Sequence, residues 1–307
     1  MKRNQIGGII FVIFIIIVIV VSIIQSSRSK VSVEEEVNIA KGNNISLIEL
    51  EGTIGGSSGL TGGGVISPKD VESLLTEAKK DSTNALIISI NSPGGSVEPT
   101  QEIYNSIERF KKKSGKKVYV WMKEVAASGG YYISCTADKI IAMPTTLTGS
   151  IGVIVNLINS EELLKKVGVS VYTLKKGKYK DMGSFSRSLT DEERAIFQNI
   201  IDEAYEQFLK IVSEKRNIPL SRLKELAQGQ IFTGIKAKKV GLIDDVGDLE
   251  DTVALVKKDL NLKGEPKIIS HKKRRTFFSL LENVLPYTQI DLLKSLKPLT
   301  VEYLMTP

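Results

Sequence analysis

The sequence predicts an α/β fold in which helices cover a parallel sheet. Short apolar runs at residues 85–90 and 117–122 have the pattern of strands buried on both faces. Helical patterns alternate with them through short connections, which favours parallel strands joined by right-handed crossovers. The segments NSPGGS (91–96) and AASGG (126–130) follow these two runs. Because the carboxyl ends of parallel strands meet at one edge of a sheet, both segments are expected at that edge.

A membrane anchor is predicted ahead of this domain. Residues 6–24 are 19 residues without a charge, and a helix of that length spans roughly 28 Å, close to the ~30 Å hydrocarbon core of a bilayer. A cleaved signal peptide is the alternative, but its apolar region is usually about 7–15 residues long and ends at a small-residue cleavage site. Lys2 and Arg3 precede the run and favour a cytoplasmic N-terminus. We therefore assign residues 1–27 to a single-span anchor with a short cytoplasmic N-terminus, which places the rest of the chain outside the cytoplasm at the cell membrane.

Composition narrows what the rest of the chain can do. Four of the 42 basic side chains and none of the 35 acidic ones fall in residues 1–30, so the remainder is nearly balanced, which argues against nucleic acid as a partner. A single cysteine, Cys135, allows no disulfide within the chain and no cysteine–histidine zinc site. Neither a phosphate-binding P-loop motif nor a dinucleotide-binding glycine motif occurs. We expect no metal, no organic cofactor and no nucleic-acid partner.

The elements of the first half follow from local signals. Ser67 is a good N-cap and Pro68 fits the first helical position, so a helix is expected to begin there. Ile103, Ile107 and Phe110 recur at helical spacing in the segment after NSPGGS. The elements expected in this half are a polar tether at 28–44, a strand at 45–54, a glycine-rich loop at 55–64, a helix at 67–80, a strand at 85–90, a turn at 91–96, a helix at 98–113, a strand at 117–122, a helix beginning at 129 and a strand at 139–144.

The second half is expected to add two strands and several helices. A capping box of Thr190 and Glu193 opens a long amphipathic helix at 189–217, and two more helices are expected around a turn at Gly241. The further elements expected here are a strand at 149–157, a short helix at 160–168 and a strand at 169–177. We assign residues 45–262 to one domain and residues 263–307 to a C-terminal extension whose structure the pattern does not specify.

Ser128, in AASGG, is a candidate nucleophile for acyl transfer. Gly129 follows it at a strand-to-helix turn, where a backbone N–H is well placed to stabilise an oxyanion. A second N–H could come from NSPGGS, because Gly94 and Gly95 permit backbone conformations that other residues do not. Each motif alone also fits an ordinary turn or a small residue in helix packing. Their position after successive buried strands favours a shared site.

The proton acceptor for such a serine is the harder question. The single histidine, His271, lies far along the chain in a basic run, which argues against a Ser-His-Asp triad. A lysine can act as the base if its pKa falls from ~10.4 towards about 7–8. The segment LKKGKYKDMGSFSR (174–187) places several lysines in a glycine- and serine-bearing loop. Most lysines are merely solvated, and spacing alone does not say which of these points into a site.

Five motifs together resemble those of the SppA-type signal peptide peptidases. They are NSPGGSV, VAASGGYYISCTADKI, TTLTGSIGVI, KKGKYKD and GQIFTGIKAKKVGLIDDVG, and they occur in unbroken order over roughly residues 45–250. Because each motif occurs once, the resemblance is to the short, single-domain bacterial form of these membrane-anchored serine–lysine proteases. It implies a Clp/crotonase-like peptidase fold for residues 45–262. It also implies a ring or dome of identical subunits in which neighbours complete the substrate groove.

The resemblance further implies roles for individual residues. Ser128, the serine of the A-S-G-G motif, matches the nucleophile, and Lys180, the lysine before aspartate in KYKD, matches the general base. Ser150, in TGSIG, matches a hydroxyl that orients this lysine. Gly95 and Gly129 match the two residues of the oxyanion hole.

The function implied is that of a serine endopeptidase that uses a Ser-Lys dyad to degrade remnant signal peptides after their release from preproteins. Its partners would be signal peptides and other apolar peptides, further copies of the chain, and the lipid bilayer through the N-terminal helix. Two alternatives on the same fold are a non-catalytic membrane scaffold and an acyl-CoA-type enzyme, in which paired glycine N–H groups stabilise a thioester enolate. A position outside the cytoplasm, away from CoA, disfavours the second alternative.

Overall fold

The computed structural model describes residues 43–55, 64–272 and 302–304. Within these ranges, no helix is both long and apolar enough to cross a membrane. The anchor predicted at 1–27 lies outside the described residues, as does nearly all of the predicted tether. The glycine-rich loop expected at 55–64 is likewise outside them except at its two ends.

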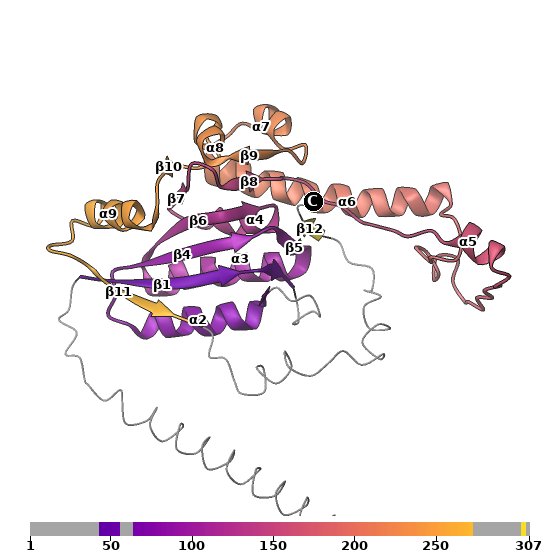
Figure 1. Ribbon diagram of the computed structural model, residues 1–307, viewed down its shortest axis with the longest axis horizontal. Helices are drawn as coiled ribbons and strands as arrows, with labels where there is room; N and C mark the ends of the chain where they lie inside the picture. Colours follow the sequence, from indigo (N-terminus) through magenta and orange to yellow (C-terminus); the bar gives the residue numbers. More distant parts are fainter. Residues whose placement is uncertain (1–42, 56–63, 273–301, 305–307) are drawn as a thin grey trace, which may run out of the picture. The chain divides into compact units, whose positions relative to one another are not determined.

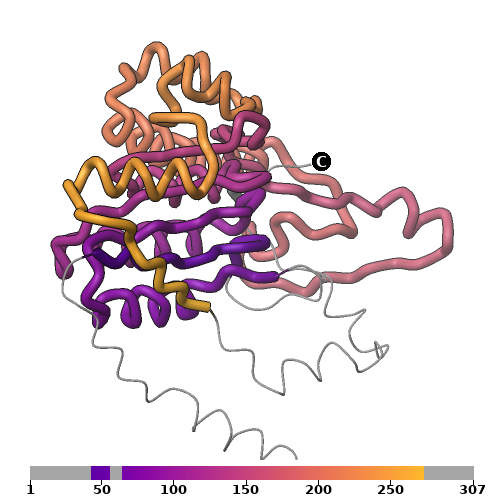
Figure 2. The backbone as a smooth tube through the Cα atoms, turned by 60° about the vertical axis from the view of Figure 1, so that its left-hand side comes forward, coloured from indigo at the N-terminus to yellow at the C-terminus, as the bar shows by residue number. Residues whose placement is uncertain are grey.

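A parallel sheet forms the centre of the described domain (Figures 1 and 2). Its strands lie in the order β10-β7-β6-β4-β1-β11, and every neighbouring pair along this path is parallel. The strands are β1 (Asn44–Glu51), β4 (Ala85–Ser92), β6 (Lys117–Ala127), β7 (Lys139–Ala142), β10 (Asp245–Val246) and β11 (Lys267–His271). The α/β class with parallel pairing, expected from the apolar runs, is confirmed.

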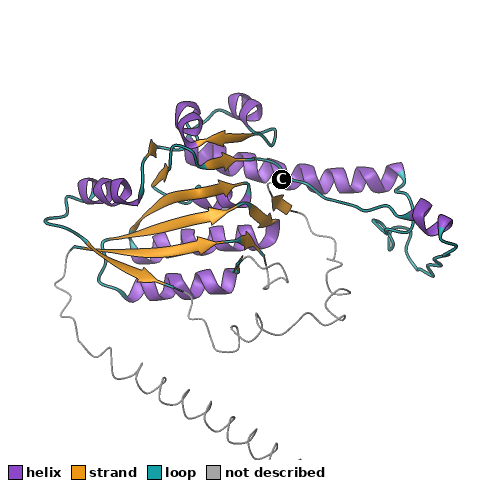
Figure 3. Ribbon diagram, viewed as in Figure 1, coloured by secondary structure: helices purple, strands orange, loops and turns teal. Residues whose placement is uncertain are grey.

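Side chains alternate between the two faces of this sheet, and each face has its own helices (Figure 3). On β4, Leu86 and Ile88 join the larger core with α2 and α3, whereas Ala85 and Ile87 join a smaller core with Val256 of α9. Burial on both faces explains why the sequence shows a continuous apolar run here and not an alternating one. The covering helices are α2 (Pro68–Lys80), α3 (Val97–Ser114), α4 (Gly129–Ser134) and α9 (Leu249–Asp259).

A small second sheet forms just beyond the carboxyl ends of β1 and β4. It consists, in order, of β12 (Glu302–Leu304), β5 (Gly94–Ser96), β2 (Thr53–Ile54) and β3 (Val65–Ile66). The turn predicted at 91–96 is therefore only partly correct, because β4 continues to Ser92 and the two glycines after Pro93 begin a strand. That strand has pairing partners on both sides: β2 is parallel to it, and β12 is antiparallel, with Tyr303 opposite Gly95.

After β8 (Leu147–Gly149), which pairs with β6, the chain leaves the sheet. Residues 152–190, called the extension below, project away from the domain in both backbone views (Figures 1 and 2). The extension contains α5 (Glu161–Lys166), and the chain returns through the long helix α6 (Asp191–Arg216).

The two strands predicted in this region, at 149–157 and 169–177, are wrong apart from the overlap with β8 and a single bridge residue at 154. Their alternating apolar residues have no neighbouring strand in the described part of the chain with which to pair. In the segment 169–177 the side chains face solvent, and those of Tyr172 and Leu174 are 88% and 100% exposed, whereas Ile151 in the first segment is buried in the larger core.

The helical signals of the second half are confirmed. Thr190 Oγ1 accepts a hydrogen bond from the N–H of Glu193, and the Glu193 carboxylate accepts one from the N–H of Thr190, which is the predicted capping box. Gly241 ends α8 with φ at 85°, a conformation that favours glycine. The elements between α6 and α9 are α7 (Leu220–Leu226), β9 (Ile231–Thr233), which is antiparallel to β8, and α8 (Gly234–Val240).

Candidate active site

Ser128 lies where β6 ends and α4 begins. Its backbone has φ 52° and ψ −116°, a sparsely populated combination that costs about 1–3 kcal/mol in a residue with a side chain. The residue is 1% exposed, and its Oγ has no hydrogen-bond partner among the described residues. A strained backbone that carries a buried, unpaired hydroxyl is typical of a functional site.

The two glycine segments meet beside this serine. A Cβ added to Gly129 would lie 3.3 Å from Gly94 Cα and 2.8 Å from Thr100 Oγ1, and a Cβ added to Gly95 would lie 1.9 Å from the carbonyl oxygen of Ile54. Close backbone approach therefore requires glycine at position 95, and at position 129 a side chain would crowd Gly94 and Thr100. The arrangement places β5 against the first turn of α4, whose N–H groups have no intrahelical acceptor and so suit an oxyanion.

Ser150 lies next to Ser128 in the backbone ladder between β6 and β8. Ala127 is opposite Gly149 in this ladder, and the N–H of Ser128 donates to the carbonyl oxygen of Gly149 at 2.8 Å. Ser150 follows at once with φ 49°, buried, and its N–H donates to the carbonyl oxygen of Gln230 at 2.9 Å. The structure thus brings the two serines and the two glycines of the predicted site to one place at the carboxyl edge of the sheet.

Two polar side chains that the sequence did not single out fasten these loops. Asn91 Oδ1 accepts a hydrogen bond from the N–H of Val125 at 3.1 Å, which ties NSPGGS to the end of β6. Ser92 Oγ accepts one from the N–H of Gly94 at 3.2 Å. Their signal is the polar pair before Pro-Gly-Gly, but an ordinary turn explains that pair equally well.

The structure does not bring Lys180 to Ser128 within one chain. The side chain of Lys180 is exposed, in a loop of the extension between α5 and α6, and no described residue donates a hydrogen bond to Ser128 Oγ. Both backbone views place the extension away from the junction of β6 and α4 (Figures 1 and 2). The predicted site is divided between the domain, which holds the nucleophile and glycines, and the extension, which holds the lysine.

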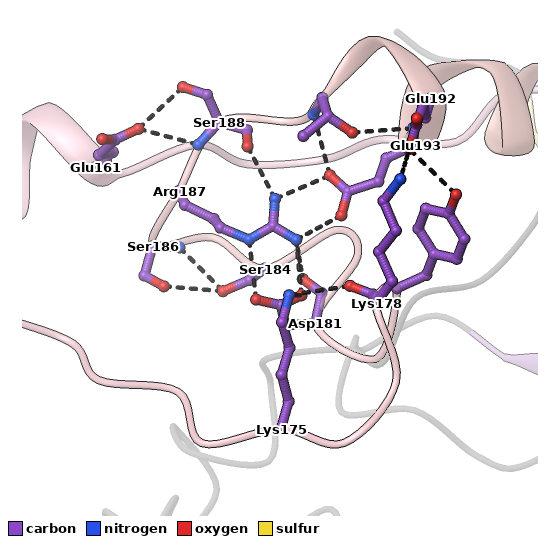
Figure 4. A network of polar contacts seen from close by, with 12 residues as sticks. Glu161, Lys175, Lys178, Asp181, Ser184, Ser186, Arg187, Ser188, Glu192 and Glu193 are labelled. Carbon is purple, nitrogen blue, oxygen red and sulfur yellow. Dashed lines mark hydrogen bonds and ion pairs between the residues drawn. The ribbon is translucent and has the colours of Figure 1, made fainter.

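Two other lysines of this loop form ion pairs with carboxylates. Lys175 forms an ion pair with Asp181, and Lys178 forms one with Glu192 on α6 (Figure 4). Hydrogen bonding to the Glu192 carboxylate raises the pKa of Lys178, which is the wrong direction for a group that must act as a neutral amine. Lys180 forms no ion pair with any described residue, so it is the better candidate for a base than either of them.

Arg187 joins this loop to α6 through an ion-pair network with Asp181 and Glu193 (Figure 4). Arg187 donates to both carboxylate oxygens of Asp181, from Nε at 3.0 Å and from Nη2 at 2.8 Å. It also donates to both oxygens of Glu193, from Nη1 at 2.8 Å and from Nη2 at 2.5 Å. The guanidinium lowers the pKa of Glu193 to about 2 and holds the pKa of Asp181 well below its usual range. Because both values are depressed, the network is fully formed above about pH 4 and weakens only as the pH falls towards 2.

Gly95→Ala is expected to lower kcat by about 10²–10³-fold, whereas Gly115→Ala leaves activity intact although it also strains the backbone. The first change drives a Cβ into the backbone of Ile54 and costs about 1–3 kcal/mol by overpacking, and it also displaces the β5 N–H groups. Loss of one oxyanion donor lowers kcat by about 10²–10³-fold. Gly115 has φ 68° and open space around it, so alanine there costs about 1–2 kcal/mol of backbone strain alone. Cleavage assays measure the activity of the two variants, and chemical denaturation measures their stability. Equal activity would show that β5 takes no part in catalysis.

Sequence comparison places the chain in a known family. The model of peptidase family S49 matches residues 110–263, about half of the chain, and this range includes Ser128, Ser150 and Lys180. The chain belongs to peptidase family S49. The resemblance to the SppA-type peptidases, which the motifs predict, is confirmed at this level. A Clp protease model also matches the S49 chain, over residues 66–148, and supports the Clp-like α/β fold.

Relatives of this S49 chain include proteins named as proteases. Serine protease SPPA, chloroplastic, of Arabidopsis thaliana is 33% identical over 228 residues, which cover 73% of this chain and 33% of that protein. A protein of Enterococcus faecium provisionally named signal peptide peptidase SppA is 37% identical over 212 residues, which cover 68% of this chain and 61% of that protein. Among solved structures, a ClpP1 mutant from Listeria monocytogenes matches 67% of this chain and 92% of its own, with 18% identity and a TM-score of 0.44. The S49 chain spans between 61% and 65% of the length of three curated relatives.

Proposed function

We propose that the chain is a membrane-anchored serine endopeptidase that degrades remnant signal peptides after their release from preproteins. The observation that carries the proposal is the buried, unpaired hydroxyl of Ser128, on a strained turn between two glycine segments. Membership of family S49 supports hydrolysis of peptide bonds. The anchor predicted at 1–27 would hold the catalytic domain at the outer face of the cell membrane, where such peptides remain after processing.

An extended peptide can bind to β5 by taking the place of β12, since β2 pairs with the other edge of β5. β12, from the C-terminal part of the chain, is antiparallel to β5, with Tyr303 opposite Gly95 and Leu304 opposite Gly94. This pairing supports a binding mode in which main-chain hydrogen bonds hold the substrate. A peptide in that place would carry its carbonyl groups past the N–H groups of Gly95 and Gly129. Recognition through the main chain suits signal peptides, because it places few demands on their side chains.

In the proposed reaction, Lys180 is the general base and Ser128 the nucleophile. The neutral amine takes the proton from Ser128 Oγ as this oxygen attacks the scissile carbonyl carbon, and the N–H groups of Gly95 and Gly129 bind the oxyanion. The protonated amine then gives its proton to the leaving nitrogen as the C–N bond breaks. The same amine next removes a proton from the water that attacks the acyl-enzyme, and it returns this proton to Ser128 Oγ as the ester C–O bond breaks. In this proposal Ser150, which neighbours Ser128 in the ladder between β6 and β8, accepts a hydrogen bond from the amine and orients it.

The dyad is proposed to form between neighbouring copies of the chain. Lys180 is carried on an extension that projects from the domain, and the Oγ of Ser128 has no partner among the described residues of its own chain. Large apolar side chains are exposed along that extension, which is typical of a surface covered in an assembly. They are Ile158, Leu163, Val167, Val169, Val171, Tyr172, Leu174, Tyr179 and Phe185. A ring or dome in which each extension lies on the next copy would cover them and complete each site.

The proposed function is tested with a synthetic signal peptide and mass spectrometry of its products. The full-length protein should cleave the peptide internally and be labelled by a fluorophosphonate probe, and Ser128→Ala should do neither. Absence of both label and products from the wild-type protein would favour a non-catalytic scaffold. Thioester turnover that survives Lys180→Ala would favour an acyl-CoA-type enzyme.

A further inference from the structure

We propose that Arg187 is a positioning residue for the general base, an inference that rests on the role proposed for Lys180. The Arg187 guanidinium lies between Asp181, the residue next to Lys180 in the chain, and Glu193, in the first turn of α6 (Figure 4). The contact is bidentate on both sides, so it restrains direction as well as distance. A helix thereby fixes the backbone that carries the base.

Little regular structure of its own holds the loop around Lys180. Residues 175–187 form turns and bends, with neither helix nor strand. Arg187 supplies main-chain restraints instead, because it also donates to the carbonyl oxygens of Asp181 at 3.2 Å and Ser188 at 3.0 Å. The middle of the loop is therefore tied to its C-terminal end by the same side chain that ties the loop to α6.

The charges explain what loss of Arg187 would do. Glu193 is 3% exposed, and no other described cation forms an ion pair with it. Without the guanidinium, the buried carboxylate of Glu193 would lose its cation and face the carboxylate of Asp181, which would keep only Lys175 as an ion-pair partner within the described part of the chain. The unpaired buried charge and the repulsion both favour movement of the loop away from α6. A displacement of about 1 Å at a catalytic group is enough to lower the rate on the order of 10²-fold.

The test compares Arg187→Met with wild type in steady-state cleavage of a quenched-fluorescence signal peptide by the full-length protein. We expect kcat to fall on the order of 10²-fold while KM stays within about twofold, because the substrate binds at β5 and not at the extension. Arg187→Lys keeps the charge but cannot make bidentate contacts to both carboxylates, so its kcat should lie between those of wild type and Arg187→Met. Lys165→Met removes two exposed ion pairs, with Glu161 and Glu162 on α5 of the same extension, and as the matched control it should keep the wild-type kcat.

A double variant separates this inference from the proposed function. In the Lys180→Ala background, Arg187→Met should lower the residual rate no further, because no base is left to position. A further loss of about tenfold or more in that background would overturn the inference. A wild-type kcat in Arg187→Met would also overturn it. The same holds if sedimentation shows that Arg187→Met forms a smaller assembly, because the fall in kcat would then have another cause. Wild-type kcat in Lys180→Ala would instead overturn the proposed base. If Arg187→Met does not fold, Arg187→Lys carries the same comparisons.

Discussion

Ser128→Gly is expected to abolish peptide cleavage and to raise the free energy of unfolding. Loss of the nucleophile lowers kcat on the order of 10⁵- to 10⁶-fold in serine proteases. Glycine reaches the backbone conformation of Ser128, φ 52°, without the strain of about 1–3 kcal/mol that a side chain adds there. That relief exceeds the roughly 0.5–1 kcal/mol of extra chain entropy that glycine loses on folding. Denaturant unfolding and the cleavage assay measure the two effects on one preparation.

Asn217→Gly is the matched control for this result. Asn217 has the same φ, 52°, at the C-cap of α6, away from the two glycine segments. Its ψ of 40° puts it in the left-handed region that asparagine tolerates, so glycine there should stabilise the protein less than at Ser128 and leave cleavage unchanged. Ser128→Ala should be as inactive as Ser128→Gly but less stable, because alanine keeps the Cβ and the strain. A Ser128→Gly protein less stable than Ser128→Ala would mean that the turn stores no strain.

The sheet and the turn at its edge were predictable because their causes are local. Burial on both faces leaves a continuous apolar run, which is how β4 and the first part of β6 could be placed. The capping box of Thr190 and Glu193 depends on residues three apart, so it too can be read from the sequence. The meeting of Gly94 with Gly129 follows from parallel pairing, since both follow strands that end at one edge.

The structure of the extension could not be predicted, because its causes are not local. Alternation of apolar residues around Val169 and Val171 looks like a half-buried strand, yet a surface that another copy covers has the same composition. Lys180 matches the position of the base in a motif, but a motif does not say whether the contact lies within one chain or between two. Glu193 could be recognised as a capping residue, whereas its pairing with Arg187 depends on the path of the loop between them.

Mixing two inactive variants, Ser128→Ala and Lys180→Ala, is expected to restore cleavage. If each site takes Ser128 from one copy and Lys180 from the next, a Lys180→Ala copy supplies the serine and a neighbouring Ser128→Ala copy supplies the lysine. In a randomly mixed assembly at equal proportions, the copy that supplies the serine has an intact Ser128 in about half of the sites, and the neighbour has an intact Lys180 in about half. About a quarter of the sites are therefore complete. Co-assembly from separately purified, tagged variants, followed by the cleavage assay, gives the recovered rate per subunit.

The dependence of the recovered rate on the mixing ratio decides where the dyad forms. For sites shared between copies, the rate follows the product of the two fractions and is greatest at equal proportions. Where both groups come from one copy, every site in the mixture lacks one of them, and no ratio restores cleavage. Contaminating wild-type protein would give a rate that rises linearly with one component, so it cannot imitate the maximum. Ser128→Ala mixed with the Ser128→Ala/Lys180→Ala double variant forms assemblies without any nucleophile, and activity there would mean that the assay reports another protease.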